Sequence, residues 1–159
     1  MTKRTFISSA LILVALVAVI WNLGFQSKPG VDTLSDENLE LTMYRSDGCA
    51  CCSKWGDYLK TEGFTVIDRP VDNLIDIKSD NNIPSELASC HTGMIDGYVV
   101  EGHVPAEDIR RMVSEKPDAI GISVPNMPMG SPGMEGHRVD PYNVVLLDEG
   151  GNHTIYAQY

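Results

Sequence analysis

Residues 39–63 read LELTMYRSDGCACCSKWGDYLKTEG. The first six residues alternate apolar and polar side chains, which is the pattern of a half-buried strand. Ser46-Asp47-Gly48 then has the composition of a turn. From Cys52 the apolar residues follow helical spacing, and Gly63 is placed to end a helix. The stretch therefore predicts a strand that leads through a cysteine-rich turn into a helix.

Apolar periodicity and turn residues predict the elements that follow. We expect, in chain order, a strand at 64–67, short helices at 73–80 and 84–87, a hairpin at 94–101, a helix at 105–115, a strand at 119–124 and a hairpin of 143–147 with 154–156. Asp96-Gly97 marks the turn of the first hairpin, and residues 125–141 are rich in proline and glycine, as in a loop. This order predicts an α/β fold, a thioredoxin-like mixed sheet with flanking helices plus a C-terminal β-hairpin.

The N-terminal segment is expected to direct the chain out of the cytoplasm. Lys3 and Arg4 precede an uncharged apolar run over residues 6–23, as in a secretory signal or an uncleaved anchor. A buried core helix is the weaker interpretation, because the run has no polar face. We therefore assign residues 1–28 to a signal peptide or N-terminal membrane anchor. The rest is expected to be periplasmic, secreted or anchored to the inner membrane by residues 6–23, with no other membrane contact.

Composition limits what the exported part can do. Residues 29–38 are polar and are expected to form a tether, which leaves 39–159 for a single domain. Beyond residue 28 the chain has 9 basic and 22 acidic residues, a formal charge of −13. Such a charge argues against nucleic acid and anionic lipid as partners.

Four cysteines, Cys49, Cys51, Cys52 and Cys90, allow three interpretations. Structural disulfides are common in exported domains, but cysteines three residues apart close almost no loop. Cys49 and Cys52 form a Cys-x-x-Cys pair before a helix, whose N-terminus favours thiolate and thiol–disulfide exchange. Three crowded sulfurs also suit soft copper(I), whereas zinc usually takes two spaced ligand pairs. On the cysteines alone, metal binding is favoured only modestly over exchange.

The loop at 125–141 strengthens the metal interpretation. It contains Met127, Met129 and Met134, followed by His137. A thioether is a soft, uncharged ligand that suits copper(I). Methionine also fills irregular gaps in a core, which would account for one or two of these residues more easily than for three. We therefore expect at least one of the three thioethers to bind copper.

One more cysteine and one histidine are expected near the same site. Cys90 precedes the first predicted hairpin, from which a thioredoxin-like fold would face the helix cysteines. His103 lies between a strand and a helix, where its ring could point into the site or serve as a cap or surface residue. His91 and His137 are weaker candidates, and His153 is expected to be solvated.

Several motifs together resemble a known family. They are Cys49-Ala-Cys-Cys52 with Trp55, Ser89-Cys-His-Thr92, Gly97-Tyr98, Glu101-Gly-His-Val-Pro-Ala106 and Met127-Pro-Met-Gly-Ser-Pro-Gly-Met134. In type and order they are similar to the CopG-like copper-resistance family, periplasmic proteins whose domain was long catalogued without a function. Ala50 stands where glycine is usual in that family, which removes no ligand.

The resemblance implies a thioredoxin-like periplasmic copper-binding protein for copper resistance. It implies Cys49, Cys51, Cys52 and Cys90 as ligands, with His103 and the methionine loop nearby. It also implies a multinuclear copper–cysteine cluster that interconverts copper(I) and copper(II), so a copper oxidoreductase activity stays open. Copper ions and other envelope copper-handling proteins are the expected partners. The alternatives are a thiol–disulfide oxidoreductase acting through Cys49 and Cys52, and a disulfide-stapled interaction domain.

Overall fold

The computed structural model describes residues 39–159. The expected signal peptide or anchor at 1–28 and the tether at 29–38 lie outside this range. Within it, no helix has the length and apolar character needed to cross a membrane. The described chain begins with β1 (Glu40–Arg45), and a short turn joins β1 to α2 (Ala50–Thr61).

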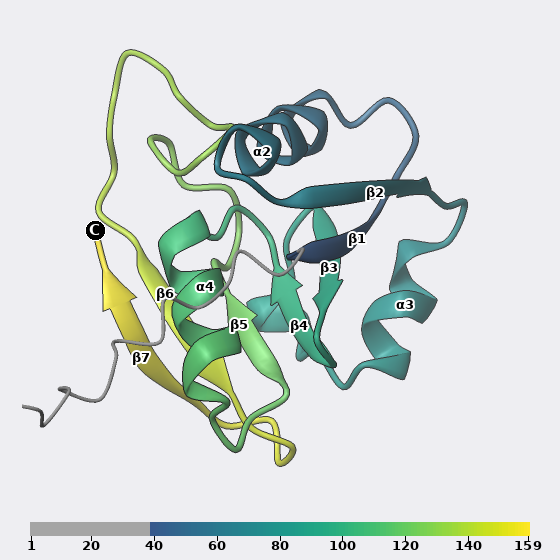
Figure 1. The fold of residues 1–159 in the computed structure, drawn as a ribbon, viewed down its shortest axis with the longest axis vertical. Coiled ribbons are helices and arrows are strands. Elements are labelled where there is room, and N and C mark those ends of the chain that lie inside the picture. The colour runs from purple at the N-terminus through teal and green to yellow at the C-terminus, as the bar shows by residue number, and fades with distance from the viewer. Residues whose placement is uncertain (1–38) are drawn as a thin grey trace, which may run out of the picture. The chain divides into compact units, whose positions relative to one another are not determined.

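The described strands form a single mixed sheet. The remaining elements are β2 (Thr65–Pro70), α3 (Leu74–Asp80), the 3-10 helix η1 (Ser85–Leu87), β3 (His91–Ile95), β4 (Tyr98–Glu101), α4 (Ala106–Glu115), β5 (Gly121–Ser123), β6 (Asn143–Leu147) and β7 (His153–Gln158). The strand order is β2-β1-β3-β4-β5-β6-β7 (Figure 1). β1 is parallel to β2 and antiparallel to β3, which is antiparallel to β4. A β-α-β unit followed by a hairpin and a helix is the predicted thioredoxin-like arrangement, which is confirmed.

The last three strands extend this sheet. β5 runs parallel to β4, and β6 and β7 form the predicted C-terminal hairpin, with a register shift between Val144 and Val145. Residues 125–141, between β5 and β6, contain no helix or strand, as expected from their proline and glycine content.

Helix α2 begins two residues earlier than its apolar pattern indicates. Cys52, Trp55 and Leu59 are fully buried on one face, as predicted. Cys49 is the N-cap residue, and its carbonyl oxygen accepts a hydrogen bond from the Ser53 N–H at 3.2 Å. Hydrophobic spacing marks only the part of a helix that is buried, so the outer side of the first turn gave no signal.

The two faces of the sheet are covered differently. On β3, the His91 ring packs against Trp55 of α2, with ring centroids 4.3 Å apart. Thr92 points to the opposite face, since neighbouring strand residues alternate. There it accepts a hydrogen bond of 3.0 Å from Lys78 of α3. No residue of α3 is fully buried, so polar contacts contribute much of what holds this helix against the sheet.

A close backbone contact next to β4 can be tested by substitution. Gly102 has a φ of +73°, and a Cβ there would lie 2.6 Å from Ser89 Cβ and from the Val124 carbonyl oxygen. Gly97, in the hairpin turn, has a φ of +83° but nothing within 4 Å of such a Cβ. Gly97→Ala should therefore cost only the left-handed backbone penalty, about 1–2 kcal/mol. Gly102→Ala should cost roughly 2 kcal/mol more, because a backbone atom must also move.

Urea unfolding of both variants, compared with wild type, measures this difference. Gly97→Ala is the matched control, since it shares the backbone conformation without the contact. Equal losses of unfolding free energy in the two variants would contradict the close approach at Gly102.

Candidate metal centre

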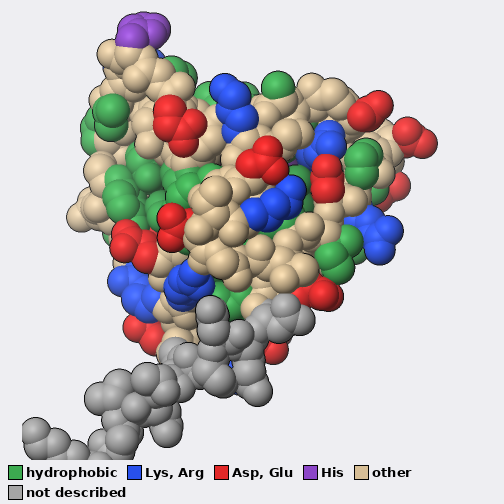
Figure 2. Space-filling model, turned by 45° about the horizontal axis from the view of Figure 1, so that its top comes forward, with side chains coloured by type: hydrophobic (Ala, Val, Ile, Leu, Met, Phe, Trp, Pro, Cys, Tyr) green, Lys and Arg blue, Asp and Glu red, His purple; other side chains and the backbone are tan. Residues whose placement is uncertain are grey.

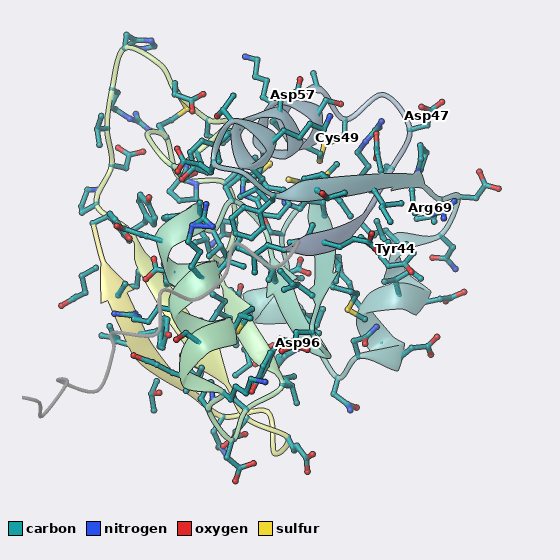
Figure 3. The ribbon with its side chains drawn as sticks, in the orientation of Figure 1. Tyr44, Asp47, Cys49, Asp57, Arg69 and Asp96 are labelled. Atoms are coloured by element: carbon teal, nitrogen blue, oxygen red, sulfur yellow. A yellow bond between two sulfur atoms is a disulfide. The ribbon has the colours of Figure 1, made fainter. Side chains whose placement is uncertain are left out.

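The start of α2 presents three cysteines at a helix N-terminus. Cys49 is the N-cap residue, and Cys51 and Cys52 belong to the first turn (Figure 3 labels Cys49 at this junction). The first turn contains no acidic residue, and no side chain caps its N–H groups. The positive end of the helix dipole therefore lies beside these three cysteines.

The pairing of β1 with β3 brings the fourth cysteine to this turn. Arg45, the last residue of β1, lies opposite His91, the first residue of β3. The chain that leaves β1 and the chain that enters β3 therefore meet at one end of the sheet. As a result, Cys52 Sγ lies 3.6 Å from the carbonyl oxygen of Cys90.

The four sulfur atoms lie within 4.8 Å of one another. Cys49 and Cys52 are joined by a disulfide, whereas Cys51 and Cys90 are free thiols. Cys51 Sγ lies 3.5 Å from Cys49 Sγ and 3.9 Å from Cys90 Sγ. The structure thus gathers all four cysteines of the predicted site and shows one pair in the oxidised form.

His103 directs a ring nitrogen at Cys90. Its Nδ1 lies 2.7 Å from the carbonyl oxygen of Pro132, and its Nε2 lies 3.1 Å from Cys90 Sγ. A carbonyl oxygen only accepts hydrogen bonds, so Nδ1 carries the proton in this contact. The Nε2 of the neutral ring is then the atom with a free lone pair, and it can accept the Cys90 thiol proton or bind a metal.

His91, a weaker candidate from the sequence, lies beside Cys90 as a second imidazole in the site. The side chain is fully buried, with Nδ1 3.3 Å from Cys90 Sγ and its ring 5.0 Å from the ring of His103. Among the described residues, its Nε2 has no hydrogen-bond partner, which is uncommon for a buried polar atom. Cys90, His91 and His103 form a second group whose ligand atoms lie within 4.8 Å of one another.

Burial shifts the pKa of the groups that line the site. It raises the pKa of the Cys90 thiol to about 12, with a further contribution from Cys51. Burial also lowers the pKa of His91 well below its ordinary value and lowers the pKa of His103. Near neutral pH, Cys90 is therefore a thiol and both rings are neutral. A metal that binds Cys90 as thiolate must displace its proton.

The methionine loop contacts the site through its backbone. A Cβ at Gly133 would lie 2.8 Å from the Trp55 amide nitrogen and 3.1 Å from the Cys51 carbonyl oxygen, so the loop passes directly over the first turns of α2. Met129 and Met134 are half-buried in this loop. Met127 is 49% exposed and lines a different pocket, together with residues of β6 and β7. His137 and His153 are exposed.

Charged side chains of both signs are interspersed over the face drawn in Figure 2, so charge alone singles out no site on that face. The sulfur and imidazole groups do mark a site, because they gather, half-buried or buried, at a helix N-terminus. Such a set can exchange disulfides or bind a soft metal. Fold and site together define a thioredoxin-like domain with a cysteine-rich site able to hold a thiophilic metal.

Two solved structures, named copper resistance protein CopG form 2 and form 1, are similar to this chain. Each is 44% identical with a TM-score of 0.74, and each alignment covers 77% of this chain and 99% or 98% of the other. A family model described as a protein of unknown function, DUF411, matches residues 87–134. No curated protein matches the chain. The chain belongs to the family of copper resistance protein CopG.

The high pKa of Cys90 predicts its reactivity in the metal-free protein. Iodoacetamide reacts with thiolate, so modification of Cys90 should be slow near neutral pH. Its rate should rise by about tenfold per pH unit until the pH approaches that pKa. Peptide mapping by mass spectrometry separates Cys90 from Cys51 while the disulfide protects the other two cysteines. A rate at Cys90 that levels off by about pH 9, the ordinary thiol value, would contradict the effect of burial.

Proposed function

We propose that this protein binds copper in the bacterial envelope as part of copper resistance, with its cysteines and histidines as ligands. The observation that carries the proposal is the pair of overlapping groups, Cys49-Cys51-Cys52-Cys90 and Cys90-His91-His103, which share one sulfur atom. The copper-resistance relatives support the same metal.

Copper(I) fits this set of donors better than other common metals. Thiolates are soft ligands, and zinc would take four donors from one tetrahedral set. Here more donors are gathered than one ion uses, and Cys90 belongs to both groups. A shared thiolate can bridge two ions, so we assign a multinuclear centre to this site. His91 would bind through Nδ1, the ring nitrogen that lies 3.3 Å from Cys90 Sγ.

The disulfide sets a condition for loading. Cys49 and Cys52 can act as thiolate ligands only after an external reductant supplies the two electrons that, with two protons, convert the disulfide to two thiols, which then release their protons to solvent as the metal binds. Mixed thiolate and imidazole ligands suit both copper(I) and copper(II), which supports a redox role for the bound metal. Export by residues 1–28 would place this chemistry in the periplasm, where oxidants and copper both occur.

Copper binding should follow the redox state and the histidines of the site. Reduced protein, loaded anaerobically, should bind more copper(I) per chain than protein whose Cys49–Cys52 disulfide is intact, because two sulfur ligands become free. Cys52→Ser should lower the stoichiometry, and His103→Ala should weaken affinity by at least about tenfold. Chelator competition and metal analysis measure both effects.

His137→Ala is the matched control, because His137 lies exposed in the same loop whose backbone contacts His103. It should leave stoichiometry and affinity unchanged. Reduced wild-type protein that retains no more copper than Cys52→Ser would rule out the proposal.

Thiol–disulfide exchange is the second candidate function. It is favoured by the Cys49–Cys52 disulfide at the N-terminus of α2, where the leaving thiolate would be stabilised. Metal-free protein would then catalyse reduction of a protein disulfide by an added dithiol, and Cys49→Ser would abolish the turnover. Such turnover without any copper affinity would make exchange the function.

The methionine loop gives a separate test. Met129→Leu and Met134→Leu keep an apolar side chain of similar volume, so each should cost less than about 1.5 kcal/mol of stability. If the thioethers bind copper(I), each substitution should weaken affinity by about tenfold, and Met127→Leu should do so as well. Met94→Leu, on β3 outside the loop, is the control. Unchanged copper(I) affinity in all three loop variants would assign the methionines to packing.

A further inference from the structure

Glu101 is a fully buried carboxylate at the end of β4. It accepts hydrogen bonds from the Ser89 backbone N–H at 2.6 Å and from the Thr92 hydroxyl at 2.7 Å. It also pairs with the ammonium group of Lys78. A buried charge is costly unless it is paired and hydrogen-bonded, and these three donors meet that requirement.

The contacts of Glu101 bracket the two ligand candidates on β3. Ser89 and Thr92 lie immediately before and after Cys90-His91. Thr92 and Glu101 face α3, whereas His91 faces Trp55 on the other side of the sheet. The carboxylate therefore holds both ends of this segment from the α3 face of the sheet, while Cys90 and His91 lie on the side of the sulfur cluster.

Lys78 connects this anchor to helix α3. Its ammonium group donates to Glu101 and, at 3.0 Å, to the Thr92 hydroxyl. The Lys78 side chain is 13% exposed, so the pair is shielded from solvent. Since α3 has no fully buried residue, this ion pair fixes the helix to the sheet and keeps the Glu101 charge compensated.

We infer that Glu101 and Lys78 are positioning residues for the copper site, a buried ion pair that sets the orientation of Cys90 and His91 through the backbone between Ser89 and Thr92. The inference rests on the proposed copper function. Neither side chain needs to touch the metal. A segment tied at both ends loses less conformational freedom when it binds copper than a free one would, so the anchor increases affinity by preorganisation.

Substitutions of graded severity test the inference. Both substitutions leave Lys78 without its carboxylate, but Glu101→Gln keeps one acceptor oxygen whereas Glu101→Leu keeps none. Copper(I) affinity should fall by about tenfold in the first and by about a hundredfold in the second, as is typical when residues that orient a ligand are changed. The double variant Glu101→Gln/Lys78→Met should weaken copper(I) affinity by less than the product of the two single fold-changes, because both residues act through one anchor.

Two readouts separate positioning from a loss of stability alone. In the metal-free protein, Glu101→Gln should increase alkylation of Cys90 at fixed pH severalfold, because the freed segment exposes the thiol more often. Asp108→Asn is the matched control, since Asp108 is a buried carboxylate of α4 that pairs with Arg111 and touches none of the ligand candidates. It should lower the melting temperature and leave copper affinity and Cys90 alkylation unchanged.

The outcomes distinguish the two proposals. Wild-type protein that binds no copper overturns the proposed function itself. Wild-type protein that binds copper, with Glu101→Gln and Lys78→Met indistinguishable from Asp108→Asn in affinity and alkylation, overturns the positioning role. If the Glu101 variants do not fold, Thr92→Val removes two of the anchor's hydrogen bonds, the one donated to Glu101 and the one accepted from Lys78, at little change in shape. Thr92→Val should lower copper(I) affinity and raise Cys90 alkylation. If it changed neither, the inference would be overturned.

Discussion

The antiparallel pairing of β1 with β3 is the constraint on which the site depends. It places the entry to β3 beside the exit from β1, so Cys90 meets the cysteines at the start of α2. Register matters as much as direction, because a slip of one residue would exchange the two faces of β3. Thr92 would then face Trp55, and the imidazole of His91 would point away from the sulfur atoms.

The two faces of the sheet separate two kinds of chemistry. Soft, polarisable donors gather on the α2 face, next to a helix N-terminus and a fully buried Trp55. The α3 face holds a hard ion pair between Lys78 and Glu101. The sheet separates the two groups. The charged pair can therefore orient the segment with Cys90 and His91 without competing for a thiophilic ion.

Much of this arrangement could be predicted from residues 39–124. Strands and the buried face of α2 leave periodic apolar patterns, and turns are marked by their residue types. His91 could not be ranked in the same way. Both His91 and Thr92 are fully buried, so polarity does not alternate along β3 and gives no sign of which side chain faces the cysteines. The Glu101–Lys78 pair joins residues 23 apart and depends on tertiary packing. Methionine suits a core as well as a metal, so the loop sequence alone could not place its thioethers.

The contact between His103 and the methionine loop has a consequence for sequence variation. The acceptor is the backbone carbonyl of Pro132, which any residue at that position would supply. The tautomer of the ring therefore depends on the path of the loop rather than on its side chains. That path requires Gly133, since any larger residue would collide with the backbone of α2. This contact therefore places no demand on the side chain at position 132, whereas it requires glycine at position 133 for His103 to keep its proton on Nδ1.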